Sequence, residues 1–185
     1  MYKEFLDTAT SRQDSRSQEQ PERIGDYLYY TKFKVYQNQT VMTLYRKHDS
    51  QNSKEELIFS PAVDKVIPNY NLSTYNLSKM SLNDSQDKIA FLIDLRNSER
   101  PTCFIKDLKT GKIFKEQLEN CSDVVWSYCG KYLYYIKKDE QYRPARLFKH
   151  KLGDTFQDTD EEVFYAEDER HWVDIRVSKD KAWFF

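Results

Sequence analysis

Few residues of this 185-residue chain have the chemistry for acid–base or nucleophilic catalysis. The histidines are His48, His150 and His171. A catalytic histidine needs a nucleophile in reach and a carboxylate that orients its ring, and no recognisable spacing of such groups surrounds these three, although a triad drawn from distant residues stays open. His48 and His150 also fall at corresponding places of a repeat described below, which indicates structural roles. We predict no catalytic residue in the chain.

Metal-binding patterns are equally weak. Cys103, Cys121 and Cys129 form no C-x-x-C pair and have no histidine at ligand spacing, so neither a zinc site nor a closed set of disulfides is indicated. The acidic runs at 158–162 and 167–170 lack the glycine and alternating oxygen ligands of a calcium loop. We predict no metal ion and no other cofactor.

Glycine spacing excludes further classes of site. The glycines are Gly25, Gly111, Gly130 and Gly153, too far apart for a phosphate-binding loop, and no G-x-S-x-G occurs. The sequence therefore contains no nucleophile elbow of an α/β-hydrolase, no dinucleotide fingerprint and no Walker motif.

Composition limits the partners and the compartment. The chain has 29 Lys and Arg against 30 Asp and Glu, so its net charge of −1 favours neither nucleic acid nor a membrane. The first residues are too charged for a secretory signal, which indicates a soluble, cytoplasmic protein. Five N-x-[ST] sequons are present, at Asn38, Asn71, Asn76, Asn83 and Asn120, and we expect them to stay unmodified without a secretion signal.

The elements that would position any site are short strands that repeat. Gly25–Tyr30 is nearly repeated by Gly130–Tyr135, 105 residues later, with related runs at Asp87–Leu92 and Asp180–Phe185. A second strand follows each copy, ending in Leu44–His48, Phe104–Asp107 and Leu147–His150, and a third run closes each unit. A unit of at least three strands in 43 to 50 residues is typical of a propeller blade.

The fold class is therefore all-β, a partial β-propeller of about three and a fraction blades. We expect blades at about 24–62, 77–120 and 124–167, the start of another at 173–185, and a short N-terminal helix with a connector over residues 1–22 ahead of the propeller domain at 23–185. The 14 Tyr and 11 Phe, together with Trp126, Trp172 and Trp183, are expected to pack between blades. Since the chain stops within a strand and an open stack of blades would leave apolar faces in water, we expect either that it is a piece of a longer protein or that something else covers its ends.

Several motifs resemble oligopeptidase B of the prolyl oligopeptidase family of serine peptidases. Asp139–Gly153 matches its pattern D-E-x-x-R-P followed by a strand ending in [KR]-H-x-L-G. Pro21–Tyr27, Glu119–Asn120 with Val125–Trp126, and Asp168–Trp172 resemble neighbouring stretches in the same order, so the likeness covers essentially the whole chain.

The resemblance implies the propeller portion of a peptidase in which seven blades cap an α/β-hydrolase domain with a Ser-Asp-His triad. It also implies a size filter that admits short peptides, which are cleaved after Lys or Arg. The partners would be the catalytic domain and short basic peptides, with no catalytic residue contributed by this segment.

One position is implied to contact the catalytic domain or the substrate. Asp94–Glu99 resembles the family segment D-x-x-G-x-E, whose acidic residue faces the catalytic domain, so Glu99 is the candidate site residue. Asn97 replaces the glycine, which its tolerance of positive φ allows, and Pro101 stands where a Tyr is usual. The alternative function is a free-standing, non-catalytic interaction module whose open blade edges bind a protein partner.

Overall fold

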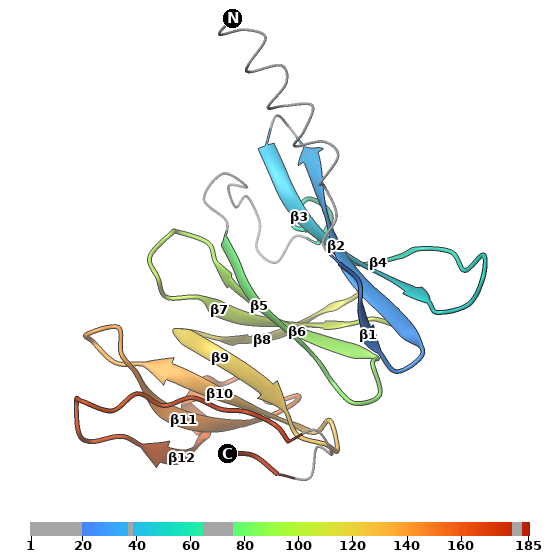
Figure 1. Ribbon diagram of the computed structural model, residues 1–185. Helices are drawn as coiled ribbons and strands as arrows, with labels where there is room; N and C mark the ends of the chain where they lie inside the picture. Colours follow the sequence, from blue (N-terminus) through green and yellow to red (C-terminus); the bar gives the residue numbers. More distant parts are fainter. Residues whose placement is uncertain (1–19, 37–38, 65–75, 179–182) are drawn as a thin grey trace, which may run out of the picture. The chain divides into compact units, whose positions relative to one another are not determined.

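The computed structural model describes residues 20–36, 39–64, 76–178 and 183–185. The chain divides into two compact units, residues 1–68 and 69–185. Three four-stranded antiparallel sheets make up the described residues, with one 3-10 turn, η2 (Gln157–Thr159), as the described helix (Figure 1). This is the all-β, partial propeller architecture that the repeats predict. The expected helix near the N-terminus lies outside the described residues.

The first unit contains one sheet. Its strands are β1 (Glu22–Ile24), β2 (Tyr27–Tyr36), β3 (Gln39–His48) and β4 (Glu56–Phe59), hydrogen-bonded in chain order. Gly25 makes the β1–β2 turn at a φ of 59°, a conformation that glycine adopts without steric cost. The rings of Tyr30 and Tyr45 stack across β2 and β3 with centroids 6.1 Å apart, so the aromatic repeat forms part of the core of this sheet.

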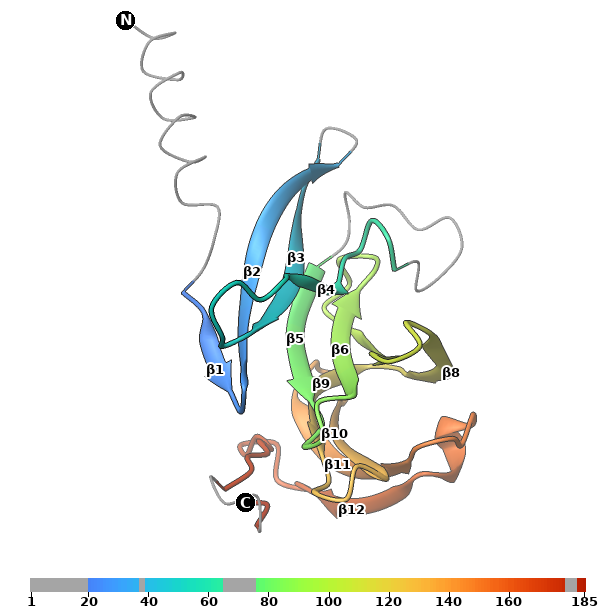
Figure 2. The same cartoon turned by 90° about the vertical axis from the view of Figure 1, so that its right-hand side faces the viewer.

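The second unit contains two sheets, each again in chain order. The first is β5 (Asn76–Leu82), β6 (Lys88–Asp94), β7 (Thr102–Asp107) and β8 (Ile113–Leu118). The second is β9 (Cys121–Trp126), β10 (Tyr132–Lys138), β11 (Pro144–Lys151) and β12 (Glu161–Tyr165). Figures 1 and 2 both show β9 beside the β5–β8 sheet.

An apolar core joins these two sheets. Ala90, Leu92, Cys103, Ile105 and Leu118 of the first pack against Cys121, Val124, Trp126, Leu133 and Tyr135 of the second. All five residues from Ile89 to Ile93 are fully buried, which explains why β6 reads as a continuous apolar run and not as an alternating one. The outer strand β12 is exposed throughout.

Two polar contacts fix how the sheets meet. The indole Nε1 of Trp126 donates to the carbonyl of Ser81, 2.9 Å away, and Lys79 of β5 forms an ion pair with Asp123 of β9. A buried Trp side chain contributes apolar contact area, and the hydrogen bond of its N–H fixes the position of one sheet relative to the other.

The tryptophans differ from the sequence prediction. Trp126 is 5% exposed, as expected for blade core, but Trp172 and Trp183 are 77% and 70% exposed. Both lie after β12, where the described residues form a single isolated bridge, Val177 with Phe184, and no further sheet. Without strands around them, these two indoles stay in solvent.

The repeat equivalence of His48 and His150 is also wrong. The strand register pairs Tyr27 with His48, but pairs Tyr132 with Lys151 and Leu133 with His150. Because side chains alternate along a strand, this one-residue offset sends the two histidines to opposite faces. His48 is exposed and His150 is fully buried.

We predict that Trp126→Ala lowers the free energy of unfolding by about 3–5 kcal/mol, because it empties a large aromatic site between two sheets. Trp183→Ala, at an exposed indole, is the matched control and is expected to change it by less than about 0.5 kcal/mol. Chemical denaturation monitored by circular dichroism measures both. A loss under about 1 kcal/mol for Trp126→Ala would show that its indole does not belong to the core.

Candidate functional site

The candidate site residue Glu99 lies at one end of the two sheets of the second unit. Successive turns of an antiparallel sheet alternate between its two ends, so the loops 95–101, 139–143 and 166–172 share one end. Figure 1 shows all three along the left-hand side of the view. The turns at 83–87 and 127–131 lie at the opposite end. The sequence segment singled out by resemblance therefore has neighbours that come from the adjacent sheet.

The carboxylate of Asp94 organises the loop around Glu99. Asp94 ends β6 and is 5% exposed. Its oxygens accept hydrogen bonds from the backbone N–H of Arg96 at 3.0 Å, the hydroxyl of Ser98 at 3.2 Å and the backbone N–H of Glu99 at 2.6 Å. Burial acts to raise the pKa of Asp94, but the backbone hydrogen bonds from Ser98, Arg96 and Glu99 outweigh it and hold the pKa below its ordinary value.

Two residues of this loop adopt left-handed backbone conformations. Asn97 has a φ of 52°, the positive φ that its tolerance of this conformation allows. Glu99 has a φ of 59°, which is uncommon for a residue with a long side chain and marks local strain. Sequence reasoning predicted the first of these and missed the second, since no turn rule places a glutamate in that conformation.

The next sheet holds the same loop from the other side. The ammonium of Lys138, at the end of β10, donates to the carbonyl oxygen of Glu99 at 2.7 Å. The guanidinium of Arg100 lies 4.6 Å from the ring centre of Tyr142 and donates to the carbonyl of Glu140 at 3.5 Å. The backbone of Glu99 is thus bonded to both sheets. Its side chain is exposed and forms no ion pair within the part of the chain that the structure describes.

A buried arginine ties the two neighbouring loops together. Arg143 is 8% exposed, and its Nε donates to the carboxylate of Asp139 at 2.8 Å. Its terminal nitrogens donate to the carbonyls of Ala166, Asp168 and His171, at 3.1, 3.0 and 2.7 Å. The planar guanidinium supplies the fixed fork of donors that this arrangement needs. Sequence reasoning did not single out Arg143, although the D-E-x-x-R-P motif contained both members of the ion pair.

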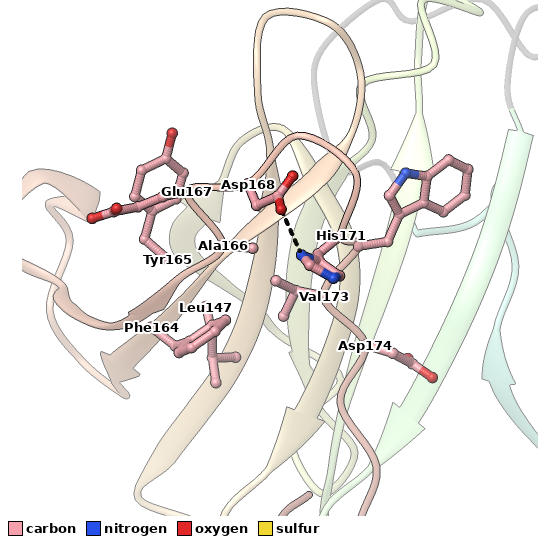
Figure 3. Close-up of a pocket in the computed structure, with 10 residues that line it drawn as sticks. Leu147, Phe164, Tyr165, Ala166, Glu167, Asp168, His171, Val173 and Asp174 are labelled. Carbon is pink, nitrogen blue, oxygen red and sulfur yellow. Dashed lines mark ion pairs between the residues drawn. The ribbon is translucent and has the colours of Figure 1, made fainter.

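A cavity of about 620 Å³ opens beside the loop that Arg143 holds (Figure 3). Leu147, Phe164, Val173 and His171 are among its lining residues. The imidazole Nδ1 of His171 lies 3.5 Å from a carboxylate oxygen of Asp168, the contact dashed in Figure 3. The side chain and backbone N–H of Arg170 bind the same carboxylate and hold the pKa of Asp168 at about 2.

This cavity does not have the composition of a hydrolytic site. Its described lining includes a histidine and three carboxylates but no Ser, Cys or Thr to act as a nucleophile. The imidazole is largely exposed, so nothing in the described surroundings excludes water from it. The arrangement can bind apolar groups, and it provides no covalent chemistry.

His150 lies in a second His–Asp contact, which is buried. Its Nδ1 is 2.7 Å from Asp160, whose other carboxylate oxygen accepts from the hydroxyl of Tyr135 at 2.8 Å. Burial is the main reason that the pKa of Tyr135 is raised above its ordinary value. Since His150 is fully buried, no substrate reaches its imidazole, and the contact is structural.

All three cysteines are free thiols. Cys103 and Cys121 are buried free thiols, and burial raises the pKa of Cys103 to about 12 and that of Cys121 well above its ordinary value. Such thiols are unreactive. Cys129 is exposed, and a hydrogen bond with Ser127 is the main cause that lowers its pKa.

Among the described residues, no group of three or more His, Cys, Asp or Glu side chains is placed to hold a metal ion. Nor does that part of the chain contain a helix that is long and apolar enough to cross a membrane.

Comparison with known proteins gives a consistent family. Residues 2–185 match the family model described as the N-terminal β-propeller domain of prolyl oligopeptidase. Protease 2 of Moraxella lacunata is 25% identical over 173 residues, which cover 89% of this chain and 24% of that protein. The chain therefore spans about a quarter of the length of this relative.

Solved structures show the same fold. Oligopeptidase B from Leishmania major superposes with a TM-score of 0.78 at 19% identity, over 91% of this chain and 23% of that one. Oligopeptidase B from Trypanosoma brucei, in a closed form with covalently bound antipain, gives 0.71 at 19% identity, over 89% and 22%.

We predict that Arg143→Met destabilises the fold by about 2–4 kcal/mol, because it removes the ion pair with Asp139 and the guanidinium hydrogen bonds to the carbonyls of the 166–172 loop. Arg170→Met is the matched control, since Arg170 is exposed and pairs with Asp168 alone, and it should cost less than about 1 kcal/mol. Denaturant unfolding measures both variants. Equal, small losses would show that the Arg143 contacts do not hold the 166–172 loop.

Proposed function

Because the chain belongs to the N-terminal β-propeller domain family of prolyl oligopeptidases, we propose that it is the non-catalytic, substrate-gating part of an oligopeptidase B-like serine peptidase that cleaves short peptides after Lys or Arg. The similarity to Protease 2 and to oligopeptidase B supports the peptidase class. We assign catalysis to a hydrolase domain outside these 185 residues, since their sequence contains no nucleophile elbow.

The observation that carries the proposal is the state of Glu99. Its backbone is held in a strained conformation by bonds to two sheets, while its carboxylate is exposed and has no described cation partner. A strained residue persists only where its surroundings hold it, and such residues gather at functional sites. An unpaired carboxylate on a rigid support is suited to bind a guanidinium of a second domain.

Gating follows from such a pair. If an arginine of the hydrolase domain binds Glu99 in the closed state, the ion pair stabilises closure over a bound peptide and breaks when the domains open. A propeller that covers the active site leaves room for short peptides and excludes folded proteins. Basic peptides are the substrate class that we propose, with the hydrolase domain as the partner of this surface.

We also propose a cytoplasmic location. Two of the five sequons support it, since their amides are already engaged in the fold. The Asn83 amide donates to Ser85 and Asp87 within the β5–β6 turn, and the Asn120 amide donates to the carbonyl of Lys138 at 2.7 Å. A glycan would replace one of the two hydrogens of the amide, so glycosylation of Asn83 would break one of its two hydrogen bonds.

A second candidate function is a non-catalytic interaction module that binds a protein partner through its open blade surfaces. The exposed aromatic residues Phe164, Tyr165 and Trp172 beside the cavity favour it. The two candidates differ in one outcome: only the first requires that the chain supports peptide hydrolysis when it is joined to a hydrolase domain.

We predict that the 185-residue chain alone does not hydrolyse Arg- or Lys-terminated reporter peptides, because its sequence has no nucleophile elbow and the two His–Asp contacts among its described residues lack a nucleophile. A fluorogenic peptide assay on the pure chain measures this. Turnover that is abolished by a serine-directed inhibitor would contradict the proposal that catalysis belongs to another domain.

We predict a role for Glu99 in catalysis by a chimera in which this chain replaces the matching segment of Protease 2. Glu99→Gln keeps the shape and removes the charge, so kcat/KM for an Arg-containing peptide should fall about 5- to 150-fold, the range of a coupling free energy of about 1–3 kcal/mol. The melting temperature should hardly change, because the pair forms only between domains.

The matched control is Glu140→Gln, which removes an exposed carboxylate from the same end of the sheets and should leave kcat/KM unchanged. High salt should lower the kcat/KM of the native chimera toward that of the Glu99→Gln variant, because salt screens an ion pair that becomes exposed when the domains open. Kinetics of native and variant that are alike from low to high salt would make Glu99 a solvated turn residue.

A further inference from the structure

The conformation of Glu99 needs support from outside its own loop. A non-glycine residue at a φ of 59° is less stable than in its ordinary conformations, so an isolated hairpin tip would populate others. The bond from its N–H to Asp94 holds one side of the residue. The carbonyl on the other side accepts its described side-chain hydrogen bond from Lys138, which belongs to the adjacent sheet.

Lys138 is itself fixed at the junction between the sheets. Its backbone N–H donates to the carbonyl of Asn120, and its carbonyl accepts from the side-chain amide of Asn120, at 3.1 and 2.7 Å. Asn120 lies in the link between β8 and β9, and the backbone N–H of Cys121 in turn donates to the carbonyl of Pro101 at 2.8 Å. The 95–101 loop is thus fastened to the next sheet on both sides of Arg100.

These contacts engage the two basic side chains near Glu99 with partners other than its carboxylate. The ammonium of Lys138 is 2.7 Å from the Glu99 carbonyl and forms no ion pair with its carboxylate. The Arg100 guanidinium is held over the ring of Tyr142. Neither of these two basic residues forms an ion pair with the Glu99 carboxylate, which is exposed.

We propose that Lys138 is a positioning residue for Glu99: from the neighbouring blade it locks the Glu99 backbone in the left-handed conformation and leaves the carboxylate free for an arginine of the catalytic domain. This inference rests on the function proposed above. It adds that the acidic contact is assembled by two blades, so that the packing of one blade on the next sets the geometry of the domain contact.

The first test uses the 185-residue chain and is independent of activity. Lys138→Met removes the ammonium and keeps an unbranched side chain. Lys137→Met is the matched control, since the Lys137 ammonium lies 5.5 Å from the Phe148 ring and makes no described bond to the loop. In NMR spectra, Lys138→Met should remove the left-handed Cα and Cβ shifts of Glu99 and speed its amide exchange about 3- to 10-fold.

Lys138→Arg, which retains a donor of the same charge, should restore those shifts at least in part, and Lys137→Met should leave them unchanged. Unaltered Glu99 shifts in Lys138→Met would overturn the inference. If the shifts change equally in Lys137→Met, the effect is a general loosening of β10 and the inference also fails.

The second test is a double-mutant cycle in the chimera. Lys138→Met should lower kcat/KM about 3- to 10-fold in the native background and have no further effect when Glu99→Gln is already present, because it acts through that carboxylate. If Glu99→Gln itself has no effect, the proposed function fails. If Glu99→Gln lowers kcat/KM but Lys138→Met does not, or if their effects add, the positioning role alone is wrong.

Discussion

The apolar contact between the β5–β8 and β9–β12 sheets is the constraint on which the rest of the second unit depends. A small antiparallel sheet has two faces, and β6 is apolar on both, with every side chain from Ile89 to Ile93 buried. Such a sheet is unstable unless a neighbour covers it. Trp126 is part of that cover and links the two sheets through its hydrogen bond to the carbonyl of Ser81. The positions of the loops at the ends of these sheets therefore depend on this packing.

Polar contacts at the ends of the sheets fix the conformation of the loops there. Asp94 and Arg143 are both nearly buried, and each satisfies several backbone groups of a loop that no regular structure supports. Buried charges are tolerated where they are paired and fully hydrogen-bonded, and they then specify one geometry. The loops 95–101, 139–143 and 166–172 are consequently linked to one another and do not behave as separate hairpin tips. An exposed carboxylate on such a support loses little entropy on binding a partner.

The sequence predicts the fold far better than the site. Aromatic repeats and turn residues identify the strands because burial and alternation act locally, and the positive φ of Asn97 follows from its replacement of a glycine. Register is not local: a shorter hairpin in the third sheet shifts His150 by one position relative to His48 and reverses its burial. Contacts between sheets, such as Lys138 with Glu99, join residues 39 apart and leave no periodic signal.

The division between a rigid core and a strained, exposed contact fits a gate better than it fits a catalytic site. Catalysis requires a nucleophile, a base and oxyanion donors within hydrogen-bond reach, and the two His–Asp contacts described here lack a nucleophile. A gate requires a charge that is held still and left unpaired until another domain arrives. In the proposed gate Glu99 supplies this charge: hydrogen bonds from its backbone to both sheets hold the residue, and its carboxylate is exposed.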